Sequence, residues 1–227
     1  SLAVAGTGSI TVTLSGFRAN EGVTELANSA LASGQGPDGT DTDDPSNDGD
    51  TPVPGEDVPT ITPLTENPLL GVAKEVRLIT VDDDGNFDVT FDFVLGNYGN
   101  TELRNLSLTD DLSDFWAAGL ASVSVSSADL PVNSGYDGLT DTELLGPGAS
   151  LAVGEFASLT LVLNGITDSG SYQNQATGNG DSHTGTPTPP SLSTDGPDPD
   201  PDGDGDPTNN DEPTPVVLES TPVLGLA

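Results

Sequence analysis

The chain has 227 residues, of which 37 are acidic and only four are basic, so its formal net charge at pH 7 is −33. A field this negative argues against nucleic acids and anionic membrane surfaces as partners, because each approaching phosphate adds repulsion, and it favours cations. The absence of cysteine excludes disulfides, iron–sulfur clusters and thiolate zinc sites. No stretch approaches the roughly 18 consecutive apolar residues of a membrane helix, so no direct membrane insertion is expected.

Sequence blocks from the first part of the chain recur, in the same order, further along. Residues 1–14 match 150–163, residues 26–30 match 172–176, and residues 67–73 match 221–227. The offset is 149 residues for the first pair and 154 for the last. Three matched blocks that keep their order and nearly their spacing predict a slice of a tandem array.

This repeat divides the chain into five expected parts. They are residues 1–31, the C-terminal strands of a preceding repeat; 32–66, an acidic linker; 67–180, a complete β-sandwich repeat; 181–220, an Asp/Pro-rich calcium-binding linker; and 221–227, the first strand of the next repeat. The two linkers are assigned by composition, since segments rich in Asp, Pro and Gly cannot build a core and act as extended spacers.

The complete repeat shows strand patterns separated by turn residues. In chain order, strands are expected at 69–81, 87–95, 103–108, 121–126, 150–163 and 171–178, with a hairpin turn at 82–86 and one short helical turn within 110–118. Phe87, Val89, Phe91, Phe93 and Leu95 alternate with polar residues, which is typical of a strand with one buried face. Several short strands without a sustained helical period predict an all-β fold, an immunoglobulin-like β-sandwich.

An acidic tract near the C-terminus has the spacing of a calcium loop. Carboxylates on alternate residues converge on one Ca²⁺ when glycine allows the chain to turn. The candidate ligands are Asp198, Asp200, Asp202, Asp204 and Asp206, with Asp211 at the twelfth position of one register, and a degraded copy has Asp44, Asp48 and Asp50. The tract resembles the helix-free calcium loops of thrombospondin type 3 and dockerin-like repeats. The alternative is a solvated charge run.

A second metal site is conceivable inside the repeat, where loops at one end of a sandwich converge. Its expected ligands are Asp110, Asp111, Asp137 and Asp141. Turn chemistry explains each of these aspartates equally well, because short carboxylates accept hydrogen bonds from nearby backbone amides.

The order of several short motifs resembles the conserved immunoglobulin-like repeat of long tandem arrays in bacterial and archaeal surface proteins. The motifs lie at residues 70–74, 97–100, 108–112, 151–154 and 172–176. The resemblance implies a secreted or surface-anchored stalk, adhesin or filament, with neighbouring repeats as partners and no transferable catalytic residues.

The chain is also similar to Cna-B-like adhesin domains, which implies a covalent bond. In such domains a lysine on the first strand condenses with an asparagine on the last, helped by a buried acid. The matching residues are Lys74 and Asn174; Asp92 is a candidate acid, although alternation turns it away from the phenylalanine face. The alternative is an exposed lysine and an asparagine at a strand end.

The sequence leaves three functional classes open. The first is a calcium-stiffened structural repeat of an extracellular surface protein. The second is a calcium-dependent glycan-binding or adhesive module, and the third is a fibre subunit in which residues 1–31 pair with a neighbour's open sheet edge. Catalysis is not expected, since His183, the single histidine, lies in a linker-like segment that is poorly suited to hold a general base.

Overall fold

The computed structural model describes residues 6–15, 23–51 and 57–219. They belong to two compact units, Ser1–Thr65 and Glu66–Ala227. Strands dominate both units, which confirms the expected all-β fold, and in the described residues none of the helices is long and apolar enough to cross a membrane. The unit boundary falls beside residue 67, where the complete repeat is expected to begin; the expected strand at 221–227 lies outside the described residues.

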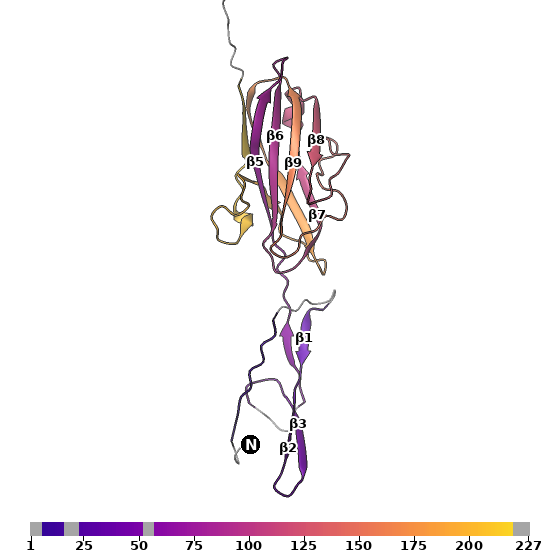
Figure 1. Ribbon diagram of the computed structural model, residues 1–227, viewed down its shortest axis with the longest axis vertical. Helices are drawn as coiled ribbons and strands as arrows, with labels where there is room; N and C mark the ends of the chain where they lie inside the picture. The colour runs from indigo at the N-terminus through magenta and orange to yellow at the C-terminus, as the bar shows by residue number, and fades with distance from the viewer. Residues whose placement is uncertain (1–5, 16–22, 52–56, 220–227) are drawn as a thin grey trace, which may run out of the picture. The chain divides into compact units, whose positions relative to one another are not determined.

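A five-stranded sheet forms one layer of the second unit, in the order β13-β5-β6-β9-β8 (Figure 1). Its strands are β5 (Leu70–Val81), β6 (Phe87–Asn97), β8 (Ser122–Ser126), β9 (Phe156–Ile166) and β13 (Thr194–Asp195). β5 and β6 form the expected hairpin, in which Asp82 accepts the amides of Asp84 and Asn86 and Gly85 has a positive φ of 87°. Strand β9 begins later than the expected 150, because Leu151 instead makes an isolated bridge to Leu103.

The remaining strands of the second unit form two smaller ladders. They are β7 (Leu103–Asp110), β10 (Gly170–Asn174), β11 (Ala176–Ser182), β12 (Ser191–Leu192) and β14 (Thr214–Leu218). β11 lies between β12 and β7, and β14 pairs with β10 in antiparallel register. One short helix, α1 (Ser113–Ala117), follows β7, and a 3₁₀ turn, η1 (Pro207–Asn209), precedes β14.

The hydrophobic core is built from the alternating inward residues of these strands. Phe91, Phe93 and Leu95 of β6 are fully buried, and Leu108 of β7 and Leu161 of β9 belong to the same cluster. Helix α1 adds Phe115, whose ring packs edge-on against Phe91 at 6.2 Å between centroids. Period-two alternation in the sequence therefore places one face of each strand in the core.

Residues 181–219 differ from the linker that their composition predicts. They supply β12, β13 and β14, and strand β14 buries Val216 and Leu218 in the core cluster. β13 pairs in parallel with β5 at Thr194–Ala73 and Asp195–Lys74. The apolar alternation of β14 is short and lies among Asp and Pro residues, so the composition of the segment does not reveal it. The folded unit is therefore larger than the expected residues 67–180.

The first unit contains two ladders that repeat part of the second. Its strands are β1 (Glu25–Asn28), β2 (Leu31–Gln35), β3 (Asp41–Pro45) and β4 (Thr60–Pro63). β1 pairs with β4 so that Asn28 faces Thr60, just as Asn174 faces Thr214 between β10 and β14. Ala30 and Ser46 exchange two hydrogen bonds, Ala30 N to Ser46 Oγ and Ser46 N to Ala30 O. Ala176 and Ser193 exchange the same two.

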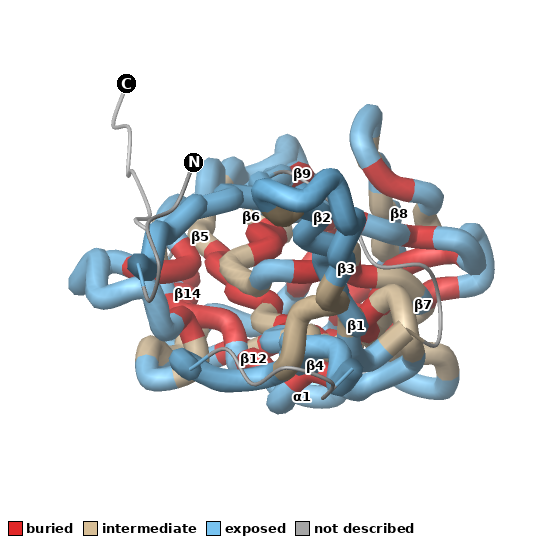
Figure 2. The backbone as a smooth tube through the Cα atoms, turned by 90° about the horizontal axis from the view of Figure 1, so that it is seen from below, coloured by how far each residue is buried: buried red, intermediate tan, exposed pale blue. Residues whose placement is uncertain are grey.

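The described residues of the first unit lack a core. None of residues 6–15, 23–51 and 57–65 is buried, and Figure 2 draws strands β1 to β4 in exposed or intermediate colours. Ile10, Val12 and Leu14 are 92%, 76% and 68% exposed, whereas the residues that match them in the sequence repeat, Leu159, Leu161 and Leu163, are 1% exposed or less. The described residues of the first unit thus form ladders of the repeat without strands that cover them.

Candidate functional site: a buried lysine, aspartate and asparagine

Lys74 is the largest polar side chain that is fully buried among the described residues. It lies on β5 and is fully buried, with Nζ 4.2 Å from the ring centroid of Phe91 and 4.9 Å from that of Phe93. The rings offer their negative faces to the ammonium group, which offsets part of its lost hydration. Burying a charged amine is costly unless it is paired, so its partner matters.

The partner of Lys74 is Asp110, the last residue of β7. Lys74 Nζ donates a hydrogen bond of 2.6 Å to Asp110 Oδ2, and both side chains are 0% exposed. The second carboxylate oxygen, Oδ1, is also buried and has no hydrogen-bond partner. Above this pair, Tyr136 donates from its hydroxyl to the Asp110 carbonyl at 3.3 Å, and burial together with Asp110 raises the pKa of Tyr136.

Asn174, at the end of β10, completes the cluster. Its side chain is 6% exposed; Nδ2 donates to the carbonyl of Asp111 at 3.0 Å, and Oδ1 is buried without a hydrogen-bond partner. Strand pairing brings it beside the other two residues. Asn174 faces Thr214, whose hydroxyl donates to the Lys74 carbonyl at 2.8 Å, and Ala176, two residues further on, pairs with Asp110.

Burial changes the acid–base properties of Lys74. Loss of hydration lowers the pKa of Lys74, and the opposing charge of Asp110 recovers part of that shift. A lysine that loses its proton to a neighbouring carboxylate becomes a nucleophilic amine. The side-chain amide of Asn174 is a group that such an amine can attack, and its carbonyl oxygen is buried without a hydrogen-bond partner.

The sequence named Lys74 and Asn174 but assigned Asp110 to a metal site. The signal for its true position was the alternation Leu106, Leu108, Asp110, which puts the carboxylate on the same inward face as two core leucines. Asp92 is turned outward as expected, with Oδ1 accepting from Thr160 and Oδ2 3.4 Å from Arg77 Nε.

The other ligands expected inside the repeat serve turns rather than one common centre. Asp111 Oδ1 accepts the amide of Ser113, and Asp141 Oδ2 accepts from Asn133. Asp137 accepts the amides of Leu139, Thr140 and Asp141, in addition to the Thr140 hydroxyl, and these hydrogen bonds lower its pKa. Among the described residues, the acidic side chains that the structure gathers closely enough to hold a metal do not include Asp110 or these three aspartates.

The C-terminal acidic tract gathers three of its aspartates. Asp200, Asp202 and Asp204 each offer one carboxylate oxygen, and these oxygens lie within 4.8 Å of one another. Asp200 is only 8% exposed, and its Oδ1 is buried without a hydrogen-bond partner. These residues are suited to a hard cation, because they offer carboxylate oxygen and no nitrogen or sulfur.

The remaining aspartates of the two tracts have other roles. Asp198 accepts the Asp200 amide, Asp206 caps η1 through the amide and hydroxyl of Thr208, and the Asp211 carbonyl accepts from Gln175. In the first unit, Asp44 pairs with Ala32 between β2 and β3, and Asp48 and Asp50 are exposed beyond β3. The group of three within 4.8 Å includes none of these six aspartates.

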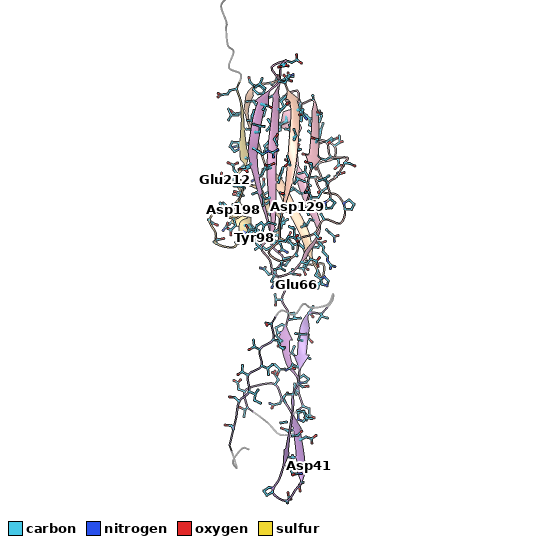
Figure 3. The ribbon with its side chains drawn as sticks, viewed as in Figure 1. Asp41, Glu66, Tyr98, Asp129, Asp198 and Glu212 are labelled. Atoms are coloured by element: carbon cyan, nitrogen blue, oxygen red, sulfur yellow. The ribbon has the colours of Figure 1, made fainter. Side chains whose placement is uncertain are left out.

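Tyr98 lies beside the same acidic tract (Figure 3). Burial and the negative charges of Asp198 and Asp200 raise its pKa to about 12.

No protein-family model matches the chain, and no curated protein sequence matches it either. The proposed function therefore rests on the positions and contacts of the residues described above.

Proposed function

We propose that this chain is a structural repeat of an extracellular surface protein, an immunoglobulin-like sandwich strengthened by an internal Lys74–Asn174 cross-link. The observation that carries the proposal is the fully buried Lys74–Asp110 pair beside a buried Asn174 whose carbonyl oxygen has no hydrogen-bond partner. A buried lysine set against an amide and a carboxylate has little use in a merely soluble fold, because a hydrophobic residue fills the same space at lower cost.

The reaction balances without a further reagent. Lys74 passes a proton to Asp110 and its neutral amine attacks the amide carbon of Asn174. Asp110 gives that proton to the Asn174 amide nitrogen and takes the second proton of the attacking amine, the C–N bond to the original amide nitrogen breaks, and one ammonia leaves with Asp110 protonated. The product is an amide between the two side chains, with no change in oxidation state.

Such a bond suits a load-bearing role. It joins β5 to β10, strands whose linked residues are one hundred positions apart in the chain. By the same chain-entropy argument that applies to disulfides, a closed loop of this size is worth roughly 4 to 5 kcal/mol. Tension applied to the ends of the linked segment would pass through the bond instead of unzipping the sheets.

Cations and neighbouring repeats are the proposed partners. The net charge of −33 repels anionic surfaces and attracts Ca²⁺, for which the acidic tract offers three close carboxylates. The shared hydrogen-bond patterns of Asn28–Thr60 and Asn174–Thr214, and of Ala30–Ser46 and Ala176–Ser193, support the tandem array.

The test is the intact mass of the denatured full chain. We expect the wild type to be lighter than its sequence by the mass of one ammonia, and Lys74→Met and Asn174→Ala to have their full sequence masses. Asn28→Ala, the matched change in the first unit, keeps the loss. A wild type at its full sequence mass would refute the cross-link, and peptide mapping must recover residues 74 and 174 in one branched peptide.

The exposed residues of the first unit favour strand exchange as a second candidate function. Ile10, Val12 and Leu14 match buried residues of β9, which pairs with β6 on one side and with β8 on the other, so equivalent strands from a neighbour would pair with this segment and complete its sheet. Light scattering over a concentration series tests this. Assembly that Ile10→Ser with Val12→Ser abolishes would support it, and a monomer at all concentrations would contradict it.

A further inference from the structure

The acidic tract is packed against the second unit instead of extending away from it. A Cβ on Gly71 of β5 would lie 2.8 Å from Pro207 Cβ and 2.9 Å from Pro199 Cβ, so the loop that carries Asp200 to Asp206 closes directly over this glycine. Both prolines are buried. Composition alone predicted a spacer, but the ends of the loop are anchored on the outer side of β5.

The anchored segment also covers the strand that carries Lys74. Before the loop, Gly196 N donates to the Lys74 carbonyl at 3.0 Å; after it, the Thr214 hydroxyl donates to the same oxygen at 2.8 Å. The acidic loop therefore connects β13 and β14, and the residues at both of its ends hydrogen-bond to the same carbonyl of β5. An ion that holds the loop in place would also hold these two strands against β5.

Charge inside the loop opposes this closure. The ion pairs among the described residues are Lys74–Asp110, Arg77–Asp92 and Arg104–Glu102, so none of them neutralises the tract. Asp200 Oδ2 accepts the Gly205 amide at 2.9 Å, but Oδ1 is buried with no partner, which is unfavourable for a carboxylate. Asp202 and Asp204 each place one carboxylate oxygen within 4.8 Å of a carboxylate oxygen of Asp200 and of each other, which adds like-charge repulsion.

We infer that Ca²⁺ binds Asp200, Asp202 and Asp204 and acts as a clasp that fastens the segment 194–218 across β5. This inference deepens the calcium part of the proposed function: the cation closes one unit, instead of stretching a spacer between units. Calcium suits the loop better than magnesium, because a loop that turns at Gly203 and Gly205, both with positive φ, tolerates the irregular shell of six to eight oxygens that calcium accepts. Water completes a shell to which the protein gives three carboxylates.

The experiment uses the full chain and measures thermal unfolding and amide hydrogen exchange in CaCl₂, in MgCl₂ and in chelator, at constant ionic strength. Extracellular calcium sites have dissociation constants of roughly 0.1 to 1 mM, so the titration must reach about 10 mM. At tenfold excess over the dissociation constant, we expect the unfolding equilibrium of the second unit to shift roughly tenfold toward the folded state. The slowed amides are expected in 194–196 and 214–218.

Two variants with equal charge changes test the site. Asp202→Asn with Asp204→Asn is expected to lose the response, whereas Asp48→Asn with Asp50→Asn, in the matched tract of the first unit, keeps it. An equal response to magnesium, a response in the Asp202/Asp204 variant like that of wild type, or no slowing in 194–196 and 214–218 would overturn the clasp. Intact mass on the same samples reports the cross-link separately, so either proposal can fail without affecting the test of the other.

Discussion

Lys74 and Asp110 form an ion pair that is wholly removed from water. Such a pair is weak evidence for stability, because its attraction is largely offset by lost hydration, but the loss of one partner leaves a buried charge. The proposed cross-link would give the pair a chemical role instead, because the ammonium group of Lys74 has a proton acceptor at 2.6 Å and the buried Asn174 has a carbonyl oxygen without a hydrogen-bond partner.

The first prediction concerns the separate energetic contributions of the two charges. Lys74→Met removes the ammonium and leaves the Asp110 carboxylate buried, whereas Asn174→Ala also prevents the cross-link but keeps the ion pair. We expect Lys74→Met to be about 3 to 5 kcal/mol less stable than Asn174→Ala in urea unfolding at neutral pH. Lys74→Met with Asp110→Leu should recover most of this loss, since it leaves no unpaired charge.

A double variant as unstable as Lys74→Met alone would contradict the electrostatic explanation and indicate a packing defect. Circular dichroism and one-dimensional NMR on each variant show whether the fold is retained before its unfolding is compared. Because neither Asn174→Ala nor the Lys74 variants can form the amide, the comparison is free of any contribution from the cross-link.

Sequence reasoning found two of the three residues in the cluster. Lys74 and Asn174 belong to short motifs with a recognisable order, but neither motif says what lies opposite them across the sheets. Asp110 was visible as an inward position of β7, yet Asp110-Asp111 after a strand also matches turn and metal-loop chemistry. The contact of Asp110 with Lys74, which lies 36 positions earlier in the chain, is visible only in the structure.

At the scale of elements, the turn of residues 137–141 shows how one aspartate organises a loop. Asp137 Oδ1 accepts the amides of Leu139, Thr140 and Asp141 at 2.7 to 2.9 Å, and its carbonyl accepts from Trp116 Nε1 at 2.8 Å. The carboxylate thus organises the loop that faces α1. Backbone donors stabilise its charged form, which explains the direction of its pKa shift.

The second prediction is a pH dependence of this turn. The pKa of Asp137 is lowered in the folded protein from its ordinary value of 3.8, so the charged carboxylate stabilises the fold above that pH. The stability difference between wild type and Asp137→Asn should be full at neutral pH. It should begin to fall below about pH 4 and vanish only once the folded carboxyl itself is protonated. Urea unfolding of both proteins from about pH 7 to about pH 2.5 measures this.

Asp83→Asn in the β5–β6 hairpin is the matched control, since it makes the same charge change in another exposed turn. A difference between wild type and Asp137→Asn that stays constant through acid would show that the lost contact is not the ionised carboxylate.

The elements themselves were predicted unevenly. Alternating phenylalanines over 87–95 and an Asp-rich turn at 82–86 identified the β5–β6 hairpin, because both signals are local. Strands β12 to β14 were missed, since their residues gain their burial from β5, β10 and β11, up to 140 positions away, as Thr214 and Lys74 illustrate. A segment rich in Pro and Asp can still form a sheet edge when a neighbour supplies the apolar partner.

At the scale of the whole chain, the two units share the pairings Asn28–Thr60 with Asn174–Thr214 and Ala30–Ser46 with Ala176–Ser193, but their burial differs. The repeat in the sequence anticipated the match of residues 26–30 with 172–176, and the ladders of β1–β4 and β10–β14 follow it. It could not anticipate the consequence for stability. The second unit covers its ladders with the β5, β6 and β9 sheet, and among the described residues of the first unit none is buried.

The third prediction follows from this contrast. Proteolysis of a native protein requires local opening, and two-stranded ladders without a hydrophobic face open at almost no cost. A broad-specificity protease at low concentration should therefore cleave within 23–63 at least a hundredfold faster than within 70–218, because a core of this kind is worth several kcal/mol. The surviving fragment should begin near Glu66, the start of the second unit.

Mass spectrometry of the digest over time measures both rates, and the fragment reports on the wider proposal. If neighbouring strands cover Ile10, Val12 and Leu14 in an assembled form, raising the protein concentration should slow cleavage in 23–63 and leave 70–218 unchanged. Protection that does not depend on concentration would show that the first unit folds by itself, and this would contradict both the exposed ladders and strand exchange. Cleavage that begins in 194–218 in chelator, but not in calcium, would place the weak point of the second unit at its acidic clasp.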